Sequence, residues 1–112
     1  MKFSEPLKKN YEFRRLYNRG KSAATPHIVM YVRKGHCENR NRLGFTVGTK
    51  VGKAVVRNHV RRRLKEIYRL NEEKLKCGLE IVIVARVRSR DAGYAELERD
   101  FLILCEKLGI MA

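Results

Sequence analysis

The stretch EIVIVARV, residues 80–87, constrains the fold more than any other part of the chain. It is a nearly continuous apolar run of strand length, which is typical of a central strand that is buried on both faces of a sheet. A chain of 112 residues, 44% of them hydrophobic, is long enough to bury one modest core around such a strand. We therefore expect a single domain, residues 1–112, in which helices pack on a sheet.

Hydrophobic periodicity and turn residues predict the other elements. Residues 10–19 favour a short helix with Asn10 as its N-cap and Gly20 at its end. Residues 27–34 and 42–48 are rich in β-branched and aromatic residues and indicate an antiparallel hairpin, to which residues 21–24 can add a short edge strand. A long helix is expected over residues 53–75 and a last one over residues 93–108, which gives the order α-β-β-β-α-β-α.

The charge of the chain is large and localised. Lys and Arg number 26 against 12 acidic residues, and the formal net charge is +14. Residues 1–21 carry 7 basic and 2 acidic groups, and residues 50–69 carry 8 and 1. A surface this basic attracts polyanions, so nucleic acid or an anionic membrane is the expected partner.

The segment GKAVVRNHVRRRLKEIYR, residues 52–69, combines this charge with helical periodicity. Val56, Val60, Leu64 and Ile67 fall on one face at helical spacing, which predicts that this face packs on the sheet. The opposite side is predicted to face solvent and carries Arg57, Asn58, Arg61, Arg62, Lys65, Tyr68 and Arg69. Like charges at i, i+4 repel, so a bound polyanion is expected to relieve them. Lys50 and Lys53 lie at the helix N-terminus, which also favours anions.

Other kinds of site receive little support from the sequence. Cys37, Cys77 and Cys105 are far apart and, with the three histidines, show no metal-binding spacing, so we expect reduced thiols and no metal site. The glycines and lysines at 20–22 and 48–53 do not match a phosphate-binding loop. No catalytic constellation is evident. No apolar segment has the length of a signal peptide or a membrane span, which favours a cytoplasmic location.

Four stretches of the chain, taken in order, identify a family. LKKNYEFRRLYNRGKS, IVMY, RLGFTVGTKVGKAVVRNHVRRRLKEIYR and EIVIVAR closely resemble the protein subunit of bacterial ribonuclease P, over essentially the whole chain. The most specific piece, VGKAVVRNHVRRRLKE, resembles the Arg-Asn-Arg signature helix of that family. His59 and Thr49 depart from the family, in which these positions are usually basic.

The resemblance implies an α/β (α+β) two-layer sandwich with about four strands in a mixed sheet, three helices and a left-handed crossover through the signature helix. It also implies that an RNA subunit is the catalyst, that Mg²⁺ serves this RNA, and that the protein assists cleavage of the 5′ leader from precursor tRNA. Neither a membrane nor DNA is an expected partner. The catalytic RNA would contact Lys50, Lys53, Arg57, Asn58, Arg61, Arg62, Lys65 and Arg69.

The family's central cleft receives the single-stranded leader. Phe13, Tyr17 and Tyr31 match aromatic positions of this cleft, and Lys9 matches a position at its edge. Aromatic faces beside a basic rim suit an unpaired strand, because base stacking is worth about 1 to 3 kcal/mol per base and tolerates any sequence. The alternative for Phe13 and Tyr17 is a place in the core.

Two further functions compete with this one. The chain could be a non-catalytic RNA-binding or ribosome-associated protein, or a nuclease that acts alone. Cleavage of precursor tRNA with and without the catalytic RNA separates the three.

Overall fold

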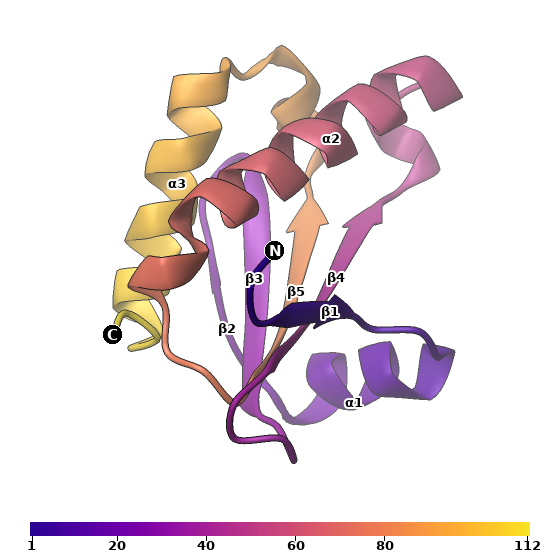
Figure 1. Cartoon of the computed structure of the whole chain (residues 1–112). Coiled ribbons are helices and arrows are strands. Elements are labelled where there is room, and N and C mark those ends of the chain that lie inside the picture. The colour runs from indigo at the N-terminus through magenta and orange to yellow at the C-terminus, as the bar shows by residue number, and fades with distance from the viewer.

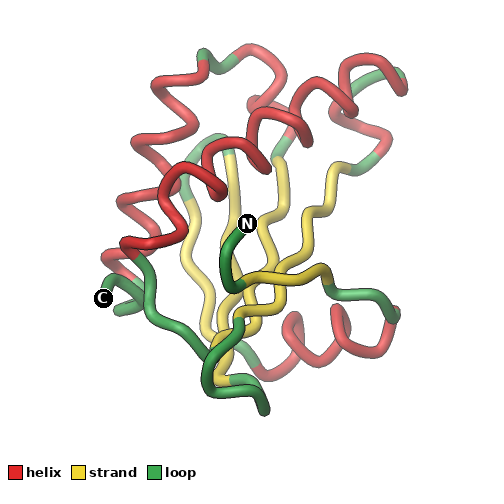
Figure 2. Tube along the Cα trace, viewed as in Figure 1, coloured by secondary structure: helices red, strands yellow, loops and turns green.

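The computed structural model describes residues 1–112, and its central strand is the apolar run of the sequence. The elements are β1 (Ser4–Pro6), α1 (Asn10–Arg19), β2 (Lys21–Ala24), β3 (Ile28–Lys34), β4 (Asn41–Val47), α2 (Ala54–Asn71), β5 (Leu79–Ala85) and α3 (Tyr94–Lys107). Short 3-10 helices cover Thr49–Val51, Glu72–Lys74 and Val87–Asp91. The strands form one mixed sheet in the order β1-β4-β5-β3-β2 (Figure 2).

Helices cover both faces of this sheet. Alternate residues of β5 point to opposite faces, and both sets are apolar, so each face needs a covering layer. Ile81 and Ile83 join the main core with α2 and α3, which includes Leu64 and Phe101. Val82 faces the other way and packs with Leu16 of α1. The mixed α+β class is confirmed, although α1 lies apart from the other two helices, on the opposite face, and the sheet has five strands instead of about four.

The predicted hairpin of β3 with β4 is wrong. These two strands do not pair, because β5 lies between them, antiparallel to β3 and parallel to β4. β5 is the most apolar strand and is buried along almost its whole length, so it takes the position that has neighbours at both edges. The edge strand predicted at residues 21–24 is present as β2, paired with β3.

The connection from β4 through α2 to β5 has the left-handed sense that the family resemblance implies. In Figure 1 both strands point upward, α2 crosses in front of the sheet, and the chain passes from β4 on the right to β5 on the left. Most connections between parallel strands are right-handed, so periodicity alone would have predicted the other hand.

The N-terminal strand β1 was not predicted, and it explains why one placement on the long helix was wrong. Tyr68 was expected to face solvent, but it is fully buried. Its hydroxyl lies 2.6 Å from Ser4 Oγ of β1 and accepts a hydrogen bond from Asn41 Nδ2. The backbone N–H groups of Lys2 and Phe3 also donate to the carboxylate of Glu72, so the N-terminal segment covers the last turns of α2.

The other helix boundaries agree with the periodicity to within a few residues. α1 begins at Asn10, but Lys9 is its N-cap residue, and Glu12 accepts a hydrogen bond from the backbone N–H of Lys9 at 3.1 Å. α2 ends at Asn71, where a 3-10 turn replaces the last expected turn.

No helix has the length and apolar character that crossing a membrane requires.

Candidate nucleic-acid interface

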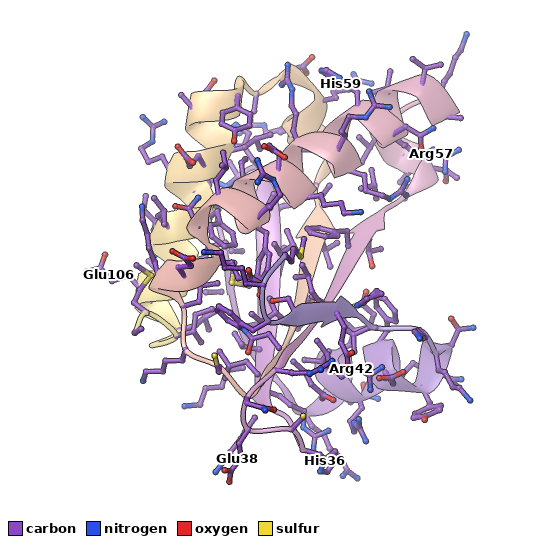
Figure 3. The ribbon with its side chains drawn as sticks, in the orientation of Figure 1. His36, Glu38, Arg42, Arg57, His59 and Glu106 are labelled. Atoms are coloured by element: carbon purple, nitrogen blue, oxygen red, sulfur yellow. The ribbon has the colours of Figure 1, made fainter.

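The first candidate surface is the outer face of α2 together with the loop before it, and we call it the basic face. Val60, Leu64 and Ile67 are buried against the sheet and α3, as the apolar spacing predicted. Six of the eight predicted RNA-binding residues are exposed: Lys50, Lys53, Asn58, Arg62, Lys65 and Arg69. The other two, Arg57 and Arg61, are half-buried. Figure 3 shows Arg57 and His59 at the end of the molecule where α2 begins.

The cations of this face are almost entirely without acidic partners. Among the Lys and Arg residues from Lys50 to Arg69, only Arg69 forms an ion pair, with Glu66 at 2.5 Å. Its hydrogen bonds lower the pKa of the Glu66 carboxyl. The remaining positive charges repel one another, and the field of such a cluster favours a bound polyanion.

Three arginines of α2 are held in different ways. Arg57 Nε donates to the carbonyl oxygen of Gly52 at 3.2 Å, and Arg61 Nη1 donates to Asn58 Oδ1 at 3.0 Å, so each keeps other guanidinium N–H groups for a ligand. Arg63 is different, because its Nη1 donates to the carbonyl oxygen of Ala92 at 2.8 Å and ties α2 to the start of α3. The sequence analysis left Arg63 out of the RNA-binding residues, and the structure shows what this side chain does instead.

We expect sulfate or phosphate to stabilise the folded protein more than chloride at the same ionic strength, because these anions can bridge the unpaired cations of the basic face. An anion at 100 times its dissociation constant adds about 2.7 kcal/mol if it binds only the folded state. Thermal unfolding followed by circular dichroism in matched sulfate and chloride series measures this. Equal melting temperatures in the two salts would contradict specific anion sites.

The second candidate surface is an open groove of about 530 Å³ between α1, β4 and α2. Its lining residues are Asn10, Phe13, Arg14, Tyr17, Phe45, Thr46, Val47 and Arg61. The groove follows the half of β4 that β1 leaves uncovered, since β1 pairs only with residues 41–43. Two aromatic residues of α1, an aromatic residue of β4 and arginines from both helices therefore share one concave surface, which we call the aromatic groove.

The aromatic side chains of α1 are partly exposed rather than buried. Tyr17 is 38% exposed, its hydroxyl lies 2.9 Å from Thr46 Oγ1, and its ring packs edge-on against Tyr31 with centroids 4.9 Å apart. The Phe13 ring lies directly over Gly44, where a Cβ atom would come within 2.5 Å of it. A glycine at this position of β4 lets the ring rest on the sheet backbone.

The groove includes some of the predicted cleft residues and not others. Phe13 and Tyr17 line it. Tyr31 and Lys9 do not: Tyr31 packs against the ring of Tyr17, and Lys9 immediately precedes the lining residue Asn10. The sequence analysis missed Phe45, and it did not place Arg61 in the cleft. Side chains alternate along β4, so the sequence could show that Phe45 points to the opposite face from Gly44 and Thr46. No sequence signal shows that Arg61 lines this groove, because its position depends on how α2 packs beside β4.

The cysteine and histidine side chains have separate, local surroundings. No group of three or more His, Cys, Asp or Glu side chains is placed to hold a metal ion. Cys105 is buried, and burial raises the pKa of its thiol to about 12, whereas Cys37 and Cys77 are exposed. His27 Nδ1 lies 2.6 Å from Asp100 Oδ2, and Thr25 Oγ1 donates to the same oxygen, which links the turn between β2 and β3 to α3.

A small mixed α+β fold with an unneutralised basic helix beside an aromatic groove is typical of a nucleic-acid-binding protein. Comparison with known proteins identifies the family. A model of the ribonuclease P family matches residues 1–109, and the chain belongs to this family.

Relatives and solved structures agree with this assignment. The chain is 47% identical over 105 residues to a ribonuclease P protein component of Clostridium botulinum, covering 93% of this chain and 94% of that protein. It is 41% identical over 112 residues to one of Alkaliphilus metalliredigens, covering both chains completely. The RNase P protein of Thermotoga maritima superimposes with a TM-score of 0.79 at 28% identity, over 88% of this chain and 93% of that one. A mutant RNase P protein of Staphylococcus aureus gives 0.87 at 25% identity, over 95% and 89%.

Proposed function

We propose that this chain, as a protein component of ribonuclease P, binds the catalytic RNA of the enzyme with the basic face. We also propose that it holds the 5′ leader of precursor tRNA in the aromatic groove. The observation that carries both statements is the position of Arg61, which extends from the basic helix into the lining of the groove. RNA on the basic face and a strand in the groove would therefore lie next to each other.

The chemistry of the basic face supports an RNA partner. Arginine holds a phosphate through two charge-assisted hydrogen bonds and stacks on bases, whereas lysine acts as a point charge. Successive turns of α2 present these groups about 5.4 Å apart along the helix. Asn58 is exposed and can serve a 2′-hydroxyl or a base edge.

The groove suits an unpaired strand because it combines aromatic surfaces with cations. Phe13, Tyr17 and Phe45 offer faces or edges to bases, and Arg14 and Arg61 can bind the phosphates between them. Stacking on aromatic side chains does not depend on base identity, so the groove can accept leaders of different sequence.

Catalysis is proposed to reside in the RNA subunit, with Mg²⁺ held by that RNA. The protein would then contribute affinity and position: it holds the leader next to the RNA that cuts it. Precursor tRNA is made in the cytoplasm of bacteria, and we propose that the chain acts there.

Reconstitution tests this proposal. Precursor tRNA is incubated with the protein, with the cognate catalytic RNA, and with both, at a Mg²⁺ concentration too low for the RNA alone. We expect leader removal only when both components are present. Cleavage by the protein alone would indicate an independent nuclease, and RNA binding without any effect on cleavage would indicate a ribosome-associated or other RNA-binding protein.

Replacing Tyr17 by Ala is expected to weaken binding of precursor tRNA to the reconstituted enzyme by about 1 to 3 kcal/mol, since one stacking surface is lost. Binding of mature tRNA, which lacks the leader, should not change. Affinities for substrates with leaders of zero to several nucleotides measure this difference.

Tyr11→Ala is the matched control, because Tyr11 lies on the same helix, is 57% exposed and does not line the groove. It should leave both substrates unaffected. A loss in Tyr17→Ala that is equal for both substrates, or a large drop in its melting temperature, would show that Tyr17 serves packing instead of leader binding.

A further inference from the structure

A third surface, separate from the basic face and the aromatic groove, is also concave. It has a volume of about 690 Å³ and is formed by the ends of β2 and β3, the loop before β5 and the turn after α3. The charged side chains in its lining are Arg19, Lys21, Arg33, Lys34, Lys76 and Glu38. We call it the basic pocket. In Figure 3, Glu38 marks this end of the molecule, opposite the end that carries Arg57 and His59.

Four of the five positive charges of this pocket have no acidic partner within the protein. Arg19, Lys21, Lys34 and Lys76 are exposed, and none of them takes part in an ion pair. Arg33 lies 3.8 Å from Glu80, but that carboxylate is already paired with Arg15 at 3.2 Å. One acidic residue therefore faces five cations around a single concavity.

The fold assembles these cations from three separate parts of the sequence. Lys21 of β2 stands beside Val32 in the register of β3, Lys34 ends β3, and Lys76 precedes β5. Bringing like charges together around a concave surface raises the local potential and costs free energy unless an anion binds there. Residues 70–112 have almost no net charge in total, so the sequence did not reveal the contribution of Lys76.

The floor of the pocket indicates which part of an anionic ligand it can recognise. It is aliphatic, with Val32, Leu79, Leu108 and Ile110, and no aromatic side chain lines it. Base stacking as in the aromatic groove is therefore excluded, and phosphate groups are the features that remain for a cationic rim to bind. None of the large hydrophobic side chains that are exposed on this protein lines the pocket, so no residue is placed there to insert into a lipid bilayer.

We propose that the basic pocket binds the backbone phosphates of a second RNA segment, separate from the RNA on the basic face. This rests on the proposed function, in that both surfaces serve the same ribonucleoprotein. The longest dimension of the protein is 36 Å, and the start of the basic face, with Arg57 and His59, lies at the end of the molecule opposite Glu38 of the pocket. A protein bound at both places connects two segments of the RNA across its own length.

The chain contains a natural attachment point for a direct test. Cys77 is exposed and lines the basic pocket, whereas Cys105 is buried and has a pKa of about 12, so it does not react with thiol reagents at neutral pH. In a Cys37→Ser variant, Cys77 is the one reactive thiol. An iron–EDTA reagent on Cys77 produces hydroxyl radicals that cut RNA near this pocket in the assembled complex with the catalytic RNA.

A tether on the basic face serves as the reference. It uses His59→Cys in a chain that also carries Cys37→Ser and Cys77→Ser. We expect discrete cleavage from both tethers, at different segments of the RNA. Cleavage from the His59→Cys tether alone would overturn the second site and leave the proposed function intact. Cleavage from neither tether would overturn both.

Charge removal gives an independent measurement. The double variant Lys34→Ala, Lys76→Ala should reduce the slope of log affinity against log salt by about one to two units, at about 0.7 to 0.9 per lost phosphate contact. The charge-matched control, Arg88→Ala with Arg99→Ala, removes two exposed cations that line neither the groove nor the pocket. If the slope of log affinity against log salt fell by the same amount in both double variants, the proposal would be overturned.

Discussion

A chain that carries Arg57→Ala, Arg61→Ala and Arg62→Ala together is expected to lose most of its affinity for RNA while it keeps its fold. If each arginine neutralises one phosphate, the slope of log affinity against log salt should fall by about two units or more, at about 0.7 to 0.9 per contact. The helix should remain, because Ala is a strong helix former and these side chains contribute no ion pairs to the folded state. Affinity for the catalytic RNA across a salt series, together with a melting curve, measures both outcomes.

Arg63→Ala is the control for this prediction, since it removes one arginine of the same helix that is already bound within the protein. Its guanidinium is bound to the carbonyl oxygen of Ala92, so we expect lower thermal stability and almost no change in the salt slope. A triple variant whose salt dependence matched that of Arg63→Ala would show that RNA does not bind to the basic face.

Replacing Asn41 by Ala is expected to destabilise the protein by about 2 to 4 kcal/mol. The Asn41 side chain is fully buried; its Nδ2 donates to the carbonyl oxygen of Lys76 at 3.0 Å and to Tyr68 Oη, and its Oδ1 accepts from the backbone N–H of Leu79 at 2.9 Å. Removing it leaves two backbone groups without partners, at about 1 to 3 kcal/mol each. Urea denaturation of the purified variant measures the change in the free energy of unfolding.

Asn39→Ala provides the comparison. Asn39 is exposed in the loop just before β4, and its side chain accepts one weak hydrogen bond, from the thiol of Cys37. This substitution should change the free energy of unfolding by less than about 0.5 kcal/mol. Similar values for the two variants would mean that the buried amide does not hold the start of β4 against α2 and β5.

The sequence predicted elements better than it predicted their neighbours. The three helices and the strands at residues 21–24, 28–34, 41–47 and 79–85 all produce a local signal, and all are present. The pairing of β3 with β4 was wrong, because adjacency along the chain favours a hairpin while the burial of β5 requires the place between them. β1 spans only three residues, Ser4–Pro6, which is too short for a periodic pattern.

The same limit applies to the candidate sites. The basic face was predictable because one helix carries all of it, and its spacing is fixed by the helix. The aromatic groove was predictable only in part, since Phe45 and Arg61 reach it from elements that are distant in the sequence. The basic pocket was not predictable, because its cations come from three segments that only the sheet brings together.

The position of β5 also determines when this protein can fold during its own synthesis. β5 is the second-last element of the chain and supplies the partner for both β3 and β4, so a nascent chain that ends before Leu79 has two strands without their common neighbour. Loop closure over these distances delays sheet formation, and open strand edges favour aggregation in the meantime. The highly charged segment at residues 50–69 leaves the ribosome before β5 does, and its mutual repulsion helps to keep the unfinished chain soluble until the central strand arrives.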